Sequence, residues 1–317
     1  MVSGAADAAG SPPLVFVGGT GRSGTHILAA LLGRHSHYRD VPIECRFHTN
    51  PQGFPDLLAG RVTVDQFLRK LRRFWWYRIK AGEFAPALVP KLPLGREVRG
   101  LHKIMPRERF DAAVSRFEAA YPSDEVGACR RLFYDLLWPL AEEAGKPGLV
   151  EMSTDSVAEG ETLTRVFPEA KLIHTVRDGR DAGSSKVSLR QKKHHPRTAA
   201  DGVEWWERRV RRIDEAVRRI PQDRLLEICL DELVEFDREA TYRSILEFLR
   251  IEDEPDMREV FETTMSAQNA HRGRWREGLS SGEEAEVVRR YEESLGRLEA
   301  EGVSFAPLLR RAYEKTG

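Results

Sequence analysis

Residues 14–26 read LVFVGGTGRSGTH, an apolar run that ends in a glycine-rich turn. The uninterrupted apolar run at residues 14–17 is typical of a strand that is buried on both faces, as in a parallel sheet. After the turn, apolar residues recur at helical spacing from Ile27 to Leu32. This stretch therefore predicts a strand, a loop and a helix in succession.

The same succession recurs twice further along the chain. Strand-like runs at residues 171–176 (KLIHTV) and 225–230 (LLEICL) are each followed by a turn and a helical pattern. Helical patterns also fill much of residues 61–80 and 107–145. Because strands that alternate with helices favour a parallel sheet, we expect an α/β fold with a P-loop-like central parallel sheet flanked by helices.

No shift in composition divides the chain into separate domains. Residues 1–13 are small and polar, without a basic or an apolar signal region, so we interpret them as a flexible lead-in rather than a signal peptide. Residues 14–317 are expected to form a single domain, with a largely helical insertion at residues 45–150. No apolar run reaches the length of about 18 residues that crossing a bilayer needs, so the expected location is the cytoplasm.

The 317-residue chain balances 50 Lys and Arg residues against 50 Asp and Glu residues. This balance argues against a nucleic-acid-binding protein held by bulk charge, although it allows a local basic patch. Cys45, Cys129 and Cys229 are widely separated, which predicts buried free thiols rather than disulfides or a zinc site. Adjacent His194 and His195 do not share one face of a helix, and we predict no metal site.

The glycine-rich turn at residues 18–26 has the composition of an anion-binding loop. Glycines let the backbone approach a phosphate closely, and the N–H groups at a helix N-terminus attract an anion. Ser23 and Thr25 add hydroxyl donors, and Arg22 adds a cation. The alternative is an ordinary turn between a strand and a helix.

A nucleotide-hydrolysing P-loop, GxxxxGK[ST], does not fit this turn. Laid over residues 19–26, the pattern places Thr25 where Lys is needed and His26 where the Mg²⁺-binding hydroxyl is needed. The cation comes earlier instead, at Arg22. This arrangement suits a shorter anionic group with no metal between protein and ligand, and it disfavours ATP-driven phosphoryl transfer.

The segment RDGRDAGSS begins at Arg177, directly after the second strand-like run. If a helix begins near Arg180, then Arg177 and Ser185 converge on one anion near the helix N-terminus. Arg180 has Asp178 and Asp181 close in sequence, which favours a local ion pair for this residue.

These motifs, GTGRSGTH, LIHTVRDGRDAGSS and RLLEICLDELV, occur in an order that resembles the PAPS-dependent sulfotransferases, the carbohydrate type more than the cytosolic aryl and steroid type. In that family the first loop holds the 5′-phosphosulfate of 3′-phosphoadenosine-5′-phosphosulfate (PAPS), and an Arg and Ser pair holds the 3′-phosphate. The segment HRGRWR at residues 271–276 resembles the late basic loop that closes over the same phosphate. The donor-binding residues that the resemblance implies are Gly21, Arg22, Ser23, Gly24, Thr25, His26, Arg177, Ser185, Arg272, Gly273 and Arg274.

Sulfuryl transfer needs a base that takes the proton of the acceptor and a cation that stabilises the departing phosphate. Arg22 is the natural stabiliser. The resemblance to the carbohydrate type implies that Glu44, just past the first helix, is the catalytic base. His102 and His48 are alternative bases, and an ion pair with Arg46 is an alternative role for Glu44.

The resemblance implies an enzyme that moves the sulfuryl group from PAPS to a hydroxyl or amine of a small-molecule, lipid or carbohydrate acceptor and releases PAP, without a metal. The alternatives are a small-molecule kinase that uses the first loop for ATP and a catalytically silent phosphonucleotide-binding protein. Residues 45–150 are expected to build the acceptor pocket. Within them, the basic and aromatic residues 68–78 fit a membrane-surface helix, part of an acceptor cleft or, as we favour, a core helix with a solvated basic face.

Overall fold

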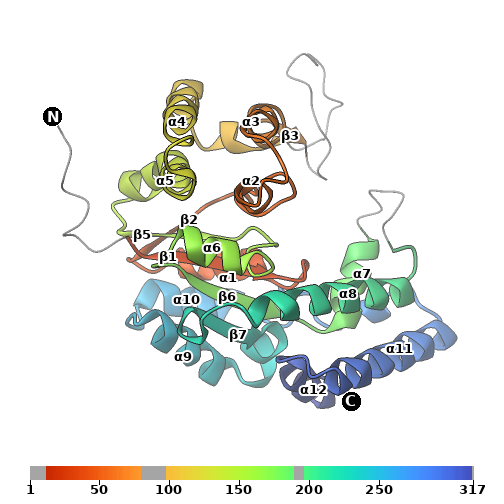
Figure 1. Cartoon of the computed structure of the whole chain (residues 1–317). Helices are drawn as coiled ribbons and strands as arrows, with labels where there is room; N and C mark the ends of the chain where they lie inside the picture. The colour runs from red at the N-terminus through yellow and green to blue at the C-terminus, as the bar shows by residue number, and fades with distance from the viewer. Residues whose placement is uncertain (1–11, 80–97, 189–195, 316–317) are drawn as a thin grey trace. The chain divides into compact units, whose positions relative to one another are not determined.

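The computed structural model of the chain describes residues 12–79, 98–188 and 196–315 (Figure 1). Its central sheet has five strands in the order β2-β5-β1-β6-β7. The strands are β1 (Leu14–Gly19), β2 (Tyr38–Asp40), β5 (Gly148–Glu151), β6 (Lys171–Val176) and β7 (Leu225–Cys229). The pairs β2–β5, β1–β5 and β6–β7 are parallel. The prediction of an α/β fold built on a parallel sheet is confirmed.

All six residues of β1 are buried, as the apolar run predicts. In register, Leu14 lies opposite Leu149 and Phe16 lies opposite Glu151 of β5. The strand therefore belongs to the interior of the sheet, and the glycine-rich turn leaves from its carboxyl end. Ligands of parallel α/β sheets bind at that edge.

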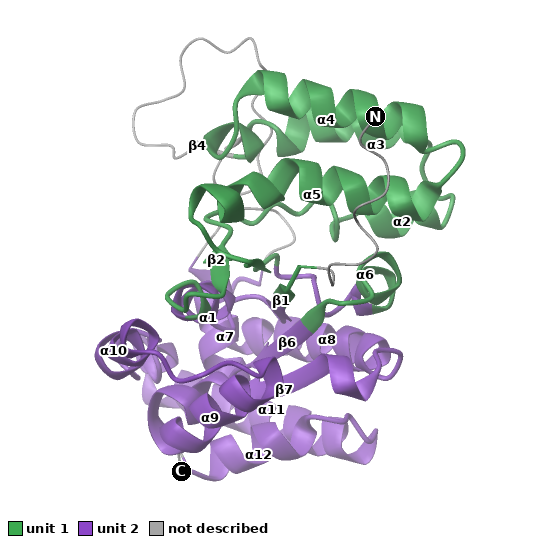
Figure 2. Ribbon diagram, turned by 90° about the vertical axis from the view of Figure 1, so that its left-hand side faces the viewer, with its two compact units in different colours: residues 1–16, 32–153, 161–171 green, residues 17–31, 154–160, 172–317 purple. Residues whose placement is uncertain are grey.

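The contacts of the chain divide it into two compact units, which Figure 2 draws in green and purple. Unit 1 comprises residues 1–16, 32–153 and 161–171, and unit 2 comprises residues 17–31, 154–160 and 172–317. Each unit has its own set of helices and its own core. The units are described separately below.

Unit 1 is mainly helical outside its strands. Its helices are α2 (Phe54–Leu58), α3 (Val64–Lys70), α4 (Arg107–Ala120), α5 (Glu125–Glu143) and most of α6 (Gly160–Val166). A π-helical turn, Leu71–Trp75, continues α3, and a short antiparallel pair is formed by β3 (Arg78–Ile79) and β4 (Val98–Arg99). Packed aromatic rings fill the core: the ring of Phe133 lies 5.6 Å from that of Phe16 and 4.7 Å from that of Phe167.

Unit 2 carries the remaining helices, which follow the motifs singled out in the sequence. They are α1 (Thr25–Leu32), α7 (Gly179–Val187), α8 (Ala199–Val217), α9 (Arg238–Leu249), α10 (Pro255–Thr264), α11 (Ser281–Ala300) and α12 (Ala306–Glu314). Helices α7 and α8 cross at a pair of glycines. A Cβ atom on Gly183 would lie 2.5 Å from the carbonyl carbon of Gly202, so the two backbones touch where no side chain fits.

Two strands of the central sheet were not predicted from the sequence. Strand β2 has three residues and β5 has four, too short for a periodic signal, and residues 38–60 also contain the prolines and glycines that mask one. The helices expected within residues 61–80 and 107–145 are present as α3, α4 and α5.

The three cysteines are free and buried, as predicted. Within the described ranges, no helix combines the length and the apolar character needed to cross a bilayer. Most of the expected lead-in, residues 1–11, and the His194 and His195 pair lie outside the described residues.

Candidate functional site

The first loop of unit 2 has an unusual backbone between β1 and α1. Gly21, Arg22 and Gly24 have φ angles of 86°, 61° and 89°, in the left-handed region. Arg22 is not a glycine, so the loop holds it in a sparsely populated conformation, as is typical of functional sites. Consecutive turns of this kind direct main-chain N–H groups into one concave cradle, which is suited to an anion.

Close packing against the loop explains why Gly19 and Gly24 are glycines. A Cβ atom on Gly19 would lie 2.3 Å from the Oγ atom of Ser23, and one on Gly24 would lie 2.8 Å from the Cδ1 atom of Leu230. The N–H group of Gly19 also donates a hydrogen bond of 3.0 Å to the carbonyl oxygen of Thr154. These contacts therefore fix the conformation of the loop.

Of the predicted hydroxyl donors, Ser23 is fully buried and lies 3.1 Å from the Oγ1 atom of Thr175. This contact ties the first loop to β6. Thr25 is buried as the first residue of α1, whereas His26 is exposed on the same helix.

The structure brings the first loop into direct contact with the second loop, the segment RDGRDAGSS that begins at Arg177. The Nε atom of Arg22 donates a hydrogen bond of 2.8 Å to the Oγ atom of Ser185, in α7. The Nη1 atom of Arg177, at the end of β6, donates one of 2.9 Å to the carbonyl oxygen of Arg22. The dense surroundings of the Arg22 guanidinium and the charge of Arg177, in that order, lower the pKa of Arg22.

Arg177 also reaches the late basic segment. Its Nη2 atom donates to the carbonyl oxygens of Ala270, at 2.7 Å, and His271, at 3.0 Å. The residue is 6% exposed, and its buried Nε atom has no hydrogen-bond partner among the described residues. One guanidinium therefore joins the three predicted donor-binding segments, and its buried Nε–H group stays unused among the described residues.

Asp181 also holds the late segment. Its buried carboxylate accepts hydrogen bonds from the N–H groups of Gly273, at 2.7 Å, and Trp275, at 3.1 Å. Of the two arginines predicted to bind the donor in this segment, Arg272 forms an ion pair with Glu235, and Arg274 is exposed and pairs with Glu277.

Buried carboxylates gather around the second loop: Asp178 and Asp181 belong to it, and Asp231 follows β7. Asp231, at 2% exposure, accepts a hydrogen bond of 3.0 Å from the N–H group of Asp178. Burial and the neighbouring Asp178 charge raise the pKa of Asp231 to about 6. Burial likewise raises the pKa of Asp181, although the Arg177 charge opposes the shift.

Arg180 forms the local ion pair that the sequence favoured. Its Nη2 atom lies 2.5 Å from Asp178, and its guanidinium lies 4.8–5.0 Å from the rings of Trp275, Tyr291 and Tyr313. Gly179 makes room for this cage, since a Cβ atom there would lie 2.6 Å from the Trp206 ring. Arg180 therefore packs inside unit 2 and anchors the start of α7.

The three candidate bases lie in unit 1, in different surroundings. Glu44 is 8% exposed and paired with Arg46. His48 is fully buried, with its Nε2 atom 2.9 Å from the carboxylate of Glu151. His102 is partly exposed, and burial lowers its pKa while a hydrogen bond to the Trp76 carbonyl oxygen opposes the shift.

The sequence analysis missed residues that support the first loop from outside the motifs. Arg209, in α8, donates a hydrogen bond of 3.2 Å to the carbonyl oxygen of Thr20 and pairs with Asp155. The main-chain carbonyl of Thr154 has the same supporting role. No local pattern marks these residues, because their partners lie far away in sequence.

Comparison with known proteins bears on the same segments. A model of the sulfotransferase family matches residues 13–255. The chain belongs to the sulfotransferase family. The match includes both anion loops and ends before the late basic segment at residues 271–276.

Solved sulfotransferase structures resemble this chain. The sulfotransferase domain of the Synechococcus PCC 7002 olefin synthase matches with a TM-score of 0.51 and 18% identity, over 90% of this chain and 96% of that one. STF9 from Mycobacterium avium (TM-score 0.46, 19% identity, 94% and 79% coverage) and mouse SULT7A1 complexed with PAP (0.44, 13%, 95% and 88%) are more distant in structure. The first likeness shows a shared fold, and a search of curated proteins finds no match.

Proposed function

We propose that this member of the sulfotransferase family transfers the sulfuryl group of PAPS to a hydroxyl or amine of a small-molecule, lipid or carbohydrate acceptor and releases PAP. The observation that carries the proposal is the junction in unit 2 at which Arg177 donates to the carbonyl oxygens of Arg22, Ala270 and His271. Three segments far apart in sequence meet there, and each resembles a donor-binding segment of the family.

The residues present fit a bisphosphorylated donor. Burial and the nearby charge of Arg177 lower the pKa of Arg22, and an anion would relieve the repulsion between the two guanidinium groups. The buried Nε atom of Arg177 has no hydrogen-bond partner in the described part of the chain, and an anion oxygen would satisfy it. The left-handed turns of the first loop would hold the phosphosulfate, with Arg177 and Ser185 at the 3′-phosphate.

Arg272, Gly273 and Arg274 would complete the donor site. Asp181 already orders the N–H group of Gly273, and both arginines have carboxylate partners that they would exchange for phosphate. The exposed pair of Arg274 with Glu277 is worth about 1 kcal/mol or less, so the exchange at Arg274 costs little.

The chemistry is an in-line displacement at sulfur. The acceptor oxygen forms the new S–O bond as the bond between sulfur and the 5′-phosphate oxygen breaks, and PAP leaves. Glu44 takes the proton of the acceptor, and the Arg22 guanidinium stabilises the charge on the departing phosphate. PAPS supplies the activated sulfuryl group, so the chain contributes position, charge and one base.

Glu44 remains the proposed base because a base must reach the acceptor. His48 is fully enclosed, and its Nε2 atom is already engaged by Glu151. His102 remains the alternative, since it is partly exposed and burial favours its neutral form.

Transfer of label from radiolabelled PAPS to a panel of sugars, phenols, lipids and amines tests the proposal. We expect a sulfated product with at least one acceptor class, together with stoichiometric PAP. Tight PAP binding without any transfer across the panel would favour the silent phosphonucleotide-binding protein. Phosphate transfer from ATP would favour the kinase.

A further inference from the structure

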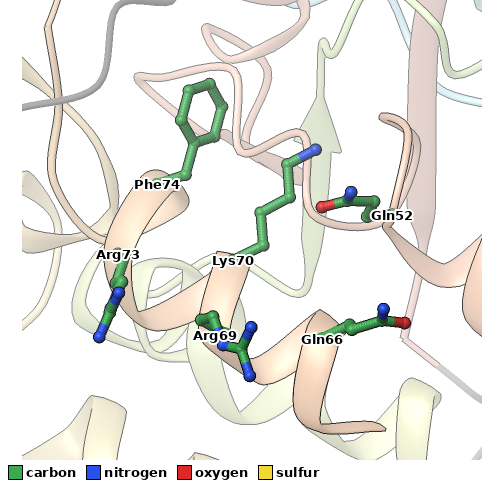
Figure 3. A pocket seen from close by; sticks show the side chains of 6 residues that line it. All are labelled: Gln52, Gln66, Arg69, Lys70, Arg73 and Phe74. Carbon is green, nitrogen blue, oxygen red and sulfur yellow. The ribbon is translucent and has the colours of Figure 1, made fainter. Parts of the chain in front are cut away.

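An open hollow of about 370 Å³ in unit 1 is lined by residues to which the proposed function gives no role. Figure 3 shows Gln52 on one side of it, facing a helical stretch that carries the other lining side chains. The lining residues are Gln52, Gln66, Arg69, Lys70, Arg73 and Phe74. Three of the six are cationic, two are amides, one is aromatic, and none is acidic.

Five of these residues share one helix face. Gln66, Arg69, Lys70, Arg73 and Phe74 are spaced i, i+3, i+4, i+7 and i+8 along α3 and the π-helical turn Leu71–Trp75. The opposite face is the buried core side, with Phe67, Leu68, Leu71 and Trp75. The sequence-based preference for a core helix with a basic outer face is therefore confirmed, and the hollow lies on that outer face.

Two backbone irregularities border the hollow. The π-helical turn contains Arg73 and Phe74, and turns of this kind occur frequently at functional sites. Gln52 has a φ angle of 66°, in the left-handed region, and its N–H group donates to the carboxylate of Asp56. Both features cost conformational energy that a plain helix and loop would avoid.

The charges of two arginines on this face are not neutralised by ion pairs in the described part of the chain. Within residues 12–79, 98–188 and 196–315, neither Arg69 nor Arg73 has an ion-pair partner, whereas Arg72 between them pairs with Glu118 at 2.8 Å. In a chain with equal numbers of acidic and basic residues, two neighbouring arginines without carboxylates leave a local positive field.

Lys70 is held in place at the floor of the hollow. Its Nζ atom donates a hydrogen bond to the carbonyl oxygen of Pro51 and lies 5.6 Å from the Phe74 ring and 5.0 Å from the Trp75 ring. Burial lowers the pKa of Lys70, while the charge of Asp56 opposes the shift. A cation that is already desolvated and fixed loses little entropy when it binds an anion.

We infer that this hollow binds an organic anion, namely a carboxylate, phosphate or sulfate group carried on an apolar body. Arg69 and Arg73 bind the oxyanion, the amides of Gln52 and Gln66 donate to it, and the ring of Phe74 contacts the apolar body. The volume suits a ring-sized group with its charged substituent. That this anion is the sulfate acceptor rests on the proposed function, and it makes the acceptor negatively charged before sulfation.

Calorimetry of the full chain with phenyl phosphate, in the presence of saturating PAP, tests the site. PAP occupies the donor loops, so the remaining heat reports the hollow. We expect the double variant Arg69→Gln, Arg73→Gln to bind phenyl phosphate at least about tenfold more weakly, because two charge-assisted contacts are lost. The matched control is Arg72→Gln, on the same turn but paired with Glu118, which should bind as the wild type does.

Phenol and inorganic phosphate separate the two parts of the claim. Each should bind more weakly than phenyl phosphate, because each lacks either the charge or the ring. Equal binding of phenyl phosphate by the wild type and the double variant, or no binding by either, would overturn the proposal. So would inorganic phosphate that binds as tightly as phenyl phosphate.

Kinetic measurements then test whether the anion bound in the hollow is the sulfate acceptor. With an anionic acceptor, the double variant should raise KM about tenfold or more while kcat and PAP affinity stay unchanged. An unchanged KM alongside weakened phenyl phosphate binding would overturn the assignment of the acceptor to the hollow. Failure of PAP to bind would overturn the proposed function alone, since the difference in phenyl phosphate binding between the wild type and the double variant would still report the hollow.

Discussion

At the level of single residues, Arg177 is both a predicted phosphate contact and a donor of hydrogen bonds to the main chain. The sequence predicted a phosphate contact for it, and the structure adds hydrogen bonds to three main-chain carbonyl oxygens. Those partners lie about 90 and 155 positions away in sequence, so no local pattern could name them. The identity and place of Arg177 were predictable, but its connecting role was not.

Arg177→Lys keeps the charge and removes the planar fork. We expect the dissociation constant of PAP to rise at least about tenfold. The free energy of unfolding should fall by about 2–3 kcal/mol, because buried carbonyl groups lose a charged donor. Calorimetry with PAP and urea unfolding measure both effects. Arg208→Lys, at an exposed position of α8, is the control, and a variant at position 177 that matches it would contradict this role.

The raised pKa of Asp231 makes the free energy of unfolding depend on pH. Its pKa is raised from 3.8 to about 6 in the folded state, so folding binds a proton between these values. The contribution of Asp231 to stability is therefore most favourable below about pH 4 and is lost as the pH rises through about 6.

Comparison of the wild type with Asp231→Asn isolates this contribution. Between pH 4 and pH 7, we expect the wild type to lose stability relative to the variant. The difference between their free energies of unfolding should change by up to about 3 kcal/mol. Urea unfolding at several pH values measures it. A difference that stays constant over this window would show that Asp231 does not titrate there.

Glu44 is the proposed catalytic base. We expect Glu44→Gln to lower kcat about 10²–10⁴-fold with unchanged PAP affinity, because the amide cannot accept the proton. Arg46→Gln removes the same ion pair but leaves the carboxylate, so it serves as the control and should change kcat less than tenfold. Equal, small effects of the two substitutions would reduce Glu44 to an ion-pair partner and favour His102.

At the level of elements, long periodic signals were predictable and short ones were not. The apolar run of β1 and the motif after β6 located the two loops correctly, because each has a strand signal on one side and a helix signal on the other. Strands β2 and β5 carry too few residues for a pattern. The closeness of α7 to α8 depends on Gly183 and Gly202, and a glycine inside a helix gives no information about its partner.

The crossing of α7 and α8 predicts a contrast between two glycines. Gly183→Ala should lower the free energy of unfolding by about 2–4 kcal/mol, because its Cβ atom would meet the backbone of Gly202. Gly296→Ala, at an exposed position of α11 with nothing within 4 Å of the added atom, should raise it by about 0.5–1 kcal/mol. Urea unfolding of the two variants measures both changes in the free energy of unfolding. Similar effects of the two substitutions would contradict the backbone contact.

At the level of the whole molecule, the two units carry different parts of the proposed chemistry. All predicted donor-binding residues lie in unit 2, and the candidate bases and the basic hollow lie in unit 1. The proposed donor segments have recognisable motifs because phosphate recognition uses a few backbone conformations with recognisable residues. The acceptor could not be predicted, because a pocket lined by helices is shaped by side chains that no short motif encodes.

Calorimetry with PAP and with ATP tests the central claim most directly. If Arg22, Arg177 and Ser185 hold one donor, PAP should bind with a dissociation constant on the order of micromolar, and removal of Mg²⁺ with a chelator should leave that constant unchanged. ATP should bind more weakly, because Thr25 and His26 replace the lysine and the metal-binding hydroxyl of a P-loop. Tighter binding of ATP than of PAP would contradict the account.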